Sequence, residues 1–96
     1  MLLDQLRQMK EPLNTLAHHD GASHLRVFGS VARGEETPQS DADFLVEFTR
    51  GYDLFLQRLP LTQQLADLLG RRVDLVPEHE LNPHIRQHVL RKAIAL

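Results

Sequence analysis

The chain has 96 residues, of which 42% are hydrophobic and 25% charged, and its formal net charge is −2. The absence of cysteine excludes disulfides and thiolate metal sites, the charge balance argues against direct nucleic-acid binding, and no apolar run spans a bilayer. A chain of this size buries roughly 60–65% of its unfolded surface, so we expect residues 1–96 to form one domain. Because the N-terminal segment has neither signal-peptide nor transit-peptide character, we expect a cytoplasmic protein without a membrane partner.

The first third of the chain predicts a helix, a strand and a short helical turn. Apolar residues recur at helical spacing over residues 2–17, where Pro12 predicts a kink. Residues 24–28 (HLRVF) read as a short strand that leads directly into Gly29-Ser30. Residues 30–33 then predict one turn of helix.

A polar loop over residues 34–40 precedes the most regular pattern in the chain, DADFLVEF (41–48). Its residues alternate between apolar and acidic side chains, with Leu45 as the apolar exception, so they predict a strand with one buried face.

The remaining elements are a helix, a strand and a closing helix. Residues 53–69 predict a helix capped by Asp53, with a break or kink at Pro60 and a stop at Gly70. Residues 72–76 (RVDLV) predict the last strand, and Asn82-Pro83 opens a helix that runs to about residue 93. Helices and strands thus mix along the chain, which predicts a single α/β (α+β) domain.

Three aspartates stand where strands are predicted, although aspartate is depleted in strands. Asp41 and Asp43 are two residues apart, so both point to the same face of one strand. Two carboxylates held close together repel unless a cation lies between them. Asp74 interrupts the last strand in the same way, and three converging carboxylates are able to hold two metal ions for a phosphoryl-type transfer. With oxygen ligands only, Mg²⁺ is the first expectation and Mn²⁺ the second.

Gly29-Ser30 supplies a complement to these carboxylates, because a strand-to-helix junction points backbone N–H groups outward and binds phosphate. Gly29 allows a close approach and the Ser30 hydroxyl adds a donor. Arg33 has two interpretations, a contact to the triphosphate or a solvated ion pair. Taken singly, each motif also has a plain explanation: a turn for Gly-Ser, a capped loop end for Asp-x-Asp, and an exposed strand residue for Asp74.

Taken together, the motifs are specific. The segment FGSVARGEETPQSDADFLVEF (28–48) contains Gly-Ser, ten intervening residues and Asp-x-Asp, and it resembles the signature of the DNA polymerase β-like nucleotidyltransferase superfamily. The form GSVARG, the serine before the first aspartate and the later GRRVDLVPE resemble the minimal nucleotidyltransferases, which are antitoxins paired with HEPN-domain toxins. Ala42, Phe44 and Pro60 depart from the usual family pattern and concern packing more than chemistry.

The resemblance implies a polymerase β-like fold, a small mixed sheet flanked by helices, and a role for each site residue. Gly29 and Ser30 would bind the nucleotide phosphates, beside the contact that the residues themselves suggest for Arg33, and Asp41, Asp43 and Asp74 would be the catalytic, metal-binding carboxylates. It implies Mg²⁺ as cofactor, with two ions, ATP as donor, and AMP transfer to a tyrosine hydroxyl of a partner HEPN ribonuclease.

Size adds an argument for a protein partner. Larger nucleotidyltransferases append a domain that shapes the acceptor pocket, and this chain has little length left to build one. Either the acceptor is a macromolecule that brings its own surface, or another copy of the chain completes the site, and both readings predict a protein partner. The resemblance implies that this partner is the HEPN toxin, in a hetero-oligomer. Two alternatives stay open: an antitoxin that neutralises its partner by steric binding without catalysis, and a nucleotidyltransferase that acts on a small molecule such as an antibiotic.

Overall fold

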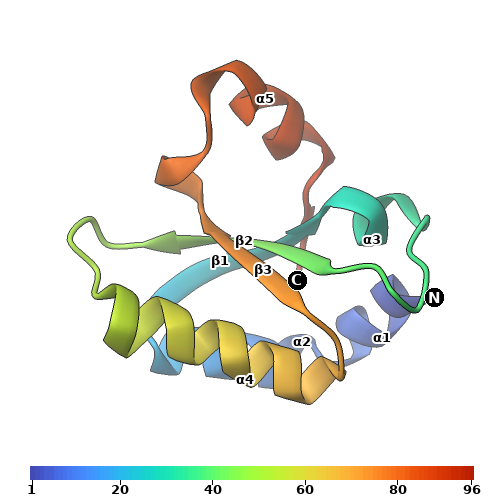
Figure 1. The fold of residues 1–96 in the computed structure, drawn as a ribbon, viewed down its shortest axis with the longest axis horizontal. Helices are drawn as coiled ribbons and strands as arrows, with labels where there is room; N and C mark the ends of the chain where they lie inside the picture. The colour runs from blue at the N-terminus through green and yellow to red at the C-terminus, as the bar shows by residue number, and fades with distance from the viewer.

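Four strands form one mixed sheet in the computed structural model of the chain, which describes residues 1–96 (Figure 1). The strands are β1 (Ala22–Phe28), β2 (Ala42–Phe48), β3 (Val73–Pro77) and β4 (Ile94–Ala95). Their order in the sheet is β3-β2-β1-β4. β1 runs antiparallel to β2 and β4, whereas β2 and β3 are parallel. The predicted mixed sheet flanked by helices is confirmed.

Three helices, α1 (Leu2–Gln8), α2 (Lys10–His19) and α4 (Leu59–Leu69), cover one face of this sheet (Figure 1). We call this face the core face, because the main apolar cluster of the molecule lies between it and the helices. The alternation predicted for residues 41–48 is confirmed, since every second side chain of β2 is buried there: Ala42, Phe44, Val46 and Phe48. The apolar face of β2 therefore fixes which of its side chains point the other way.

The break in the N-terminal helix lies at Met9, one turn before the predicted kink at Pro12. Pro12 falls in the first turn of α2, where a helix does not need its N–H. Its ring crowds the carbonyl group of Gln8 and it has no N–H to donate to it, so the chain bends ahead of the proline.

Asp53 caps the second helical stretch as predicted, because its Oδ1 accepts the N–H groups of Phe55 at 2.8 Å and Leu56 at 2.9 Å. A wide π-type turn, η1 (Leu54–Arg58), comes first and runs directly into α4. Pro60 is the second residue of α4, so the predicted break is a change of helix type. Gly70 ends α4 in a left-handed conformation, as predicted.

The opposite face of the sheet, which we call the outer face, lies beneath α5 (Pro83–Lys92) in Figure 1. The predicted start of this helix is confirmed, since Asn82 Oδ1 accepts the N–H of His84 at 2.9 Å. After α5 the chain returns to pair β4 with the free edge of β1. The sequence did not predict this strand, because two residues carry no periodicity.

No helix in the structure unites the length and the apolar character that crossing a bilayer demands; the longest, α4, has 11 residues.

Candidate active site

The end of β1 and the helix α3 (Gly29–Arg33) form one wall of the candidate site, at the right of Figure 1. The predicted helical turn is confirmed, and it begins at Gly29 immediately after the strand. Gly29 has a φ of +70°, and a Cβ atom there would collide with the Asp43 carboxylate. Glycine is therefore required both by the backbone conformation and by the approach of Asp43.

Asp43 and Asp74 are direct neighbours in the sheet. β2 and β3 pair in parallel with Asp43 opposite Asp74, and Asp43 also pairs with Phe28 at the end of β1. Because Asp43 alternates with buried residues of β2, its carboxylate points to the outer face. Asp74 lies on the same face beside Leu75, which is buried in the core. The sheet therefore brings together two aspartates that are 31 positions apart in the sequence.

The prediction that Asp41 lies on the strand is wrong. Asp41 is exposed and lies one residue before β2. The strand pairing begins only at Ala42, whose N–H donates to the carbonyl of Arg72 at 2.9 Å. Burial, followed by the charges of Asp74 and Asp41, raises the pKa of Asp43 above its ordinary value, while Arg33 acts in the opposite direction. Asp43 thus lies in the field of both other aspartates.

The three aspartates share one end of the outer face without forming a closed cluster. No three His, Asp or Glu side chains lie close enough in this arrangement to hold a metal ion. Mutual repulsion of unshielded carboxylates favours such an open arrangement. The donors fit a hard divalent cation nevertheless: all are carboxylate oxygens, and glycine at position 29 leaves room beside Asp43. Their joint coordination of a metal stays a prediction.

Arg33 forms a surface ion pair in the structure. Its Nε donates to Glu35 Oε2 at 3.2 Å, and its side chain is 49% exposed. Of the two interpretations of Arg33, the structure therefore shows the solvated ion pair. A contact of Arg33 with phosphate stays a prediction. Ser30 is half-buried in the first turn of α3, and its carbonyl accepts the N–H of Glu35 at 2.9 Å.

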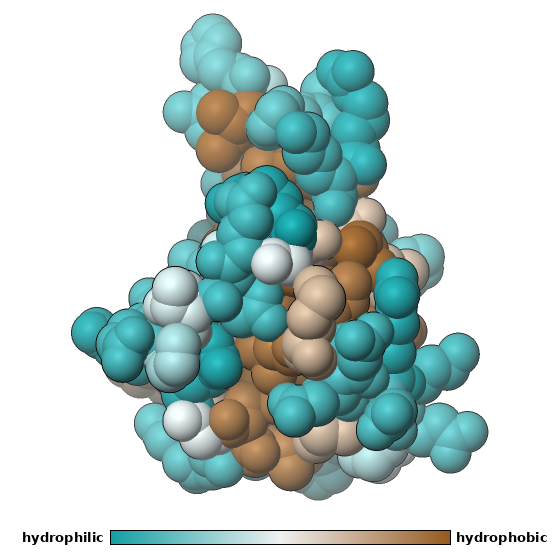
Figure 2. All heavy atoms as spheres, turned by 90° about the vertical axis from the view of Figure 1, so that its right-hand side faces the viewer, coloured by the Kyte–Doolittle hydropathy of each residue, from teal (hydrophilic) through white to brown (hydrophobic).

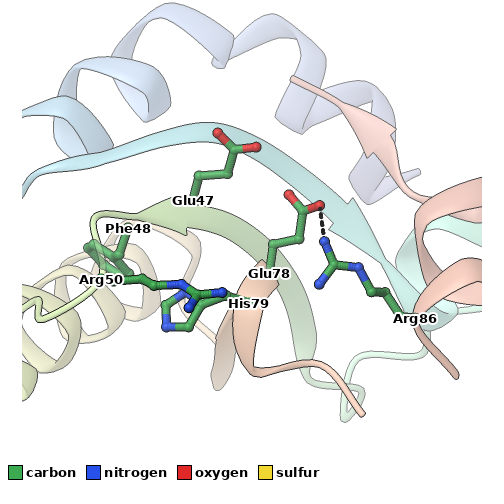
Figure 3. A pocket seen from close by; sticks show the side chains of 6 residues that line it. All are labelled: Glu47, Phe48, Arg50, Glu78, His79 and Arg86. Carbon is green, nitrogen blue, oxygen red and sulfur yellow. Dashed lines mark hydrogen bonds and ion pairs between the residues drawn. The ribbon is translucent and has the colours of Figure 1, made fainter. Parts of the chain in front are cut away.

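A charged network that the sequence did not predict occupies the other end of the outer face (Figure 3). Glu78 accepts hydrogen bonds from Arg26 at 2.8 Å and from Arg86 at 3.2 Å. It lines an open cavity of about 250 Å³ together with Glu47 and His79. Arg26 and Glu78 stand 52 positions apart along the chain, so no local motif indicates this pair.

The second hollow of the molecule, of about 310 Å³, lies between α1 and the loop 34–41 and is lined by Glu36, Thr37 and Arg71, among others. Figure 2 shows this end of the molecule, where polar side chains surround a smaller apolar area and the α5 region projects at the top. Neither hollow contains the three aspartates, which lie open at the sheet end.

Several known proteins are similar to this chain in fold and in sequence. Residues 6–96 match the nucleotidyltransferase domain family. The chain is 42% identical over 74 residues to the protein adenylyltransferase MntA of Thermococcus cleftensis, covering 77% of this chain and 74% of the relative. A solved structure described as a putative minimal nucleotidyltransferase superposes with a TM-score of 0.85 at 47% identity, covering 98% of this chain and 95% of the other. A toxin–antitoxin crystal structure with AMP-PNP gives a TM-score of 0.72 at 26% identity, covering 84% of this chain and 66% of the other.

Proposed function

The chain belongs to the nucleotidyltransferase domain family, and we propose that it is an antitoxin that transfers AMP from ATP to a hydroxyl group of its partner toxin. The observation that carries the proposal is the meeting of Asp43 with both Gly29 and Asp74 at one sheet end. The relatives supply the reaction class, since one is named a protein adenylyltransferase and another is a toxin–antitoxin complex with an ATP analogue.

In this proposal the start of α3 binds the nucleotide, and the three aspartates hold the metal. The N–H groups and hydroxyl at Gly29-Ser30 bind phosphate oxygens, where the first turn of α3 favours negative charge. Asp41, Asp43 and Asp74 would hold Mg²⁺, which would supply neutralisation of the negative charge that develops during the transfer. Arg33 leaves its surface pair with Glu35 and adds positive charge beside the phosphates.

The reaction that we propose is a single displacement at phosphorus. The oxygen of the acceptor hydroxyl bonds to the α-phosphorus of ATP while the bond to pyrophosphate breaks. Asp74, the more exposed of the two paired aspartates, accepts the hydroxyl proton. The products are an AMP ester of the acceptor and pyrophosphate.

We propose a HEPN-domain ribonuclease as the partner and a tyrosine as its modified residue, because the sequence motifs resemble those of the minimal nucleotidyltransferases. The chain acts as one domain and forms a hetero-oligomer with this toxin in the cytoplasm, where ATP is available. Adenylylation adds a negatively charged group to the toxin and thereby silences it.

The test is the intact mass of a HEPN-domain protein encoded beside this chain, after incubation with the chain, ATP and Mg²⁺. We expect a gain of whole AMP units that the Asp41→Asn/Asp43→Asn double variant does not produce. A stable complex without any mass gain would contradict adenylylation and favour an antitoxin that acts by steric cover. Mass gain on free small alcohols in place of the protein would favour a small-molecule enzyme.

A further inference from the structure

A small hydrogen-bonded turn, residues 37–40, lies immediately before Asp41. Ser40 Oγ accepts the N–H of Thr37 at 2.9 Å, and the N–H of Ser40 donates to the Thr37 carbonyl at 3.0 Å. The N–H of Gln39 also donates to Thr37 Oγ1 at 3.3 Å. These local bonds fix the shape of the turn, but they do not fix where it lies relative to the sheet.

Arg71 supplies the link between this turn and the sheet. Its Nη1 donates to the carbonyl groups of both residues that close the turn, Thr37 at 3.2 Å and Ser40 at 3.1 Å. Arg71 itself lies two residues before β3, the strand that carries Asp74. The Arg71 guanidinium group therefore links the start of β3, the strand that carries Asp74, to Ser40, the residue before Asp41.

The three aspartates differ in how their positions are set. Asp43 and Asp74 face each other within the β2–β3 ladder, so the sheet holds both. Asp41 precedes the ladder, whose first bond here runs from the N–H of Ala42. The turn 37–40 is the neighbour of Asp41 on its other side, so a contact that anchors this turn also restrains Asp41.

We propose that Arg71 is a positioning residue that places Asp41 for cation binding beside Asp43 and Asp74. The inference rests on the proposed metal site. Arg71 acts on Asp41 indirectly, through the hydrogen bonds of its side chain to the backbone carbonyls of the turn. Arg71 makes no hydrogen bond to any of the aspartates. Its neighbour Arg72 carries the same charge at the adjacent position, is exposed, and makes no side-chain hydrogen bond. Arg72 is therefore a matched control for the loss of one positive charge.

The experiment measures Mn²⁺ affinity of the full chain by calorimetry, without ATP or partner. Arg71→Met keeps most of the side-chain stem and removes the donors, and we expect about tenfold weaker binding, as is typical when an outer-shell contact is lost. Arg71→Lys restores one donor group and the charge, and should recover part of the affinity. Arg72→Met should stay within about twofold of the wild type, because exposed charges contribute little.

A double-mutant cycle tests whether Arg71 acts through Asp41. In the Asp41→Asn background, Arg71→Met should cause no further loss of Mn²⁺ affinity, because the carboxylate that it positions is already gone. In the Asp74→Asn background its full effect should persist. Thermal unfolding checks that each variant is folded, and if Arg71→Met is not, the same cycle is run with Arg71→Gln.

Several results would overturn the inference: no loss in Arg71→Met, an equal loss in Arg72→Met, additive losses in the cycle with Asp41→Asn, or no Mn²⁺ binding by the wild type. The outcome is separable from that of the proposed function. Coupling of Arg71 to Asp41 in a chain that transfers no AMP would uphold the inference and refute the activity. AMP transfer without this coupling would refute the inference alone.

Discussion

The two ends of the outer face carry similar numbers of carboxylates, but they differ in whether those carboxylates are paired with basic side chains. At one end, which we call the aspartate end, Asp41, Asp43 and Asp74 make no hydrogen bond or ion pair with a basic side chain; the nearby Arg33 bonds Glu35. At the other, the paired end, Glu78 bonds Arg26 and Arg86, and Glu80 bonds Arg58, while the exposed Glu47 has no arginine partner.

The pKa directions express the same contrast. Burial and the neighbouring aspartates raise the pKa of Asp43. The hydrogen bond from Arg26 lowers the pKa of Glu78, and the one from Tyr52, together with Arg58, lowers that of Glu80. A carboxylate whose charge is already compensated stabilises the fold, whereas one left uncompensated on a structured sheet end has the electrostatics of a cation site. We therefore expect the cation to bind at the aspartate end and not at the paired end.

The largest effect that we expect is on AMP transfer by Asp43→Asn. The substitution keeps the shape of the side chain and removes a charge that the proposed metal needs, which is worth several kcal/mol, or about a thousandfold in rate. Transfer to the partner toxin is measured by intact mass over time. Asp67→Asn, on the exposed side of α4, is the control and should transfer normally. Undiminished transfer by Asp43→Asn would remove the aspartate end from the reaction.

The next largest effect concerns Gly29→Ala. The added Cβ would meet the Asp43 carboxylate, and displacement of a reacting group by about an ångström costs on the order of a hundredfold in rate. Gly51 is the matched control: its φ of +84° is equally left-handed, and nothing lies within 4 Å of its Cβ position. Both alanine variants should lose about 1–2 kcal/mol of stability from backbone strain. Only the variant at position 29 should lose transfer, and equal losses of transfer would contradict the assignment.

A smaller effect, on stability alone, is expected at the paired end. Glu78→Gln removes the ionised partner of Arg26 and Arg86, whose bonds to it are 2.8 and 3.2 Å long. Because the Arg26–Glu78 pair is only 16–17% exposed, we expect a loss of about 1–3 kcal/mol, read from urea unfolding, with AMP transfer unchanged. Glu35→Gln breaks an exposed pair and should cost about 0–1 kcal/mol. Loss of transfer in Glu78→Gln would show that the two ends are not separate.

The smallest effect that we expect is a pH dependence of the difference in stability between the wild type and Glu78→Gln. The folded protein lowers the pKa of Glu78 below its ordinary value of 4.5, so its stabilising contribution is full above pH 4.5 and is lost as the pH falls further. The gap in melting temperature between the wild type and Glu78→Gln should therefore narrow as the pH falls from 6 towards 3. A gap that stays constant or widens over that range would mean that Glu78 does not stabilise through its charge.

The core face was readable from the sequence because its rules are local. The alternation in β2, the cap at Asp53 and the stop at Gly70 each depend on neighbours within a few residues. Sequence patterns could not predict what depends on distant contacts. The Arg26–Glu78 pair joins residues 52 positions apart, and the pairing of β4 with β1 joins Arg26 to Ala95, 69 positions further along the chain.

For the candidate site, the sequence named candidate residues but did not predict how they lie relative to one another. The spacing of Gly29-Ser30 and the aspartates was sufficient to name them. That Asp74 lies opposite Asp43 follows from the strand order, which periodicity does not contain. That Asp41 precedes β2, and that Arg71 bonds the turn before it, both depend on where pairing with β3 begins.

The most direct test of the contrast between the two ends is to locate a bound cation. Substoichiometric Mn²⁺ added to isotope-labelled chain broadens the amide resonances of nearby residues in an NMR spectrum. The account predicts that residues 29–31, 41–43 and 73–75 broaden first, and that the Asp43→Asn variant loses this effect. Broadening centred on Glu47 and Glu78 at the paired end, or none at the aspartate end, would contradict it.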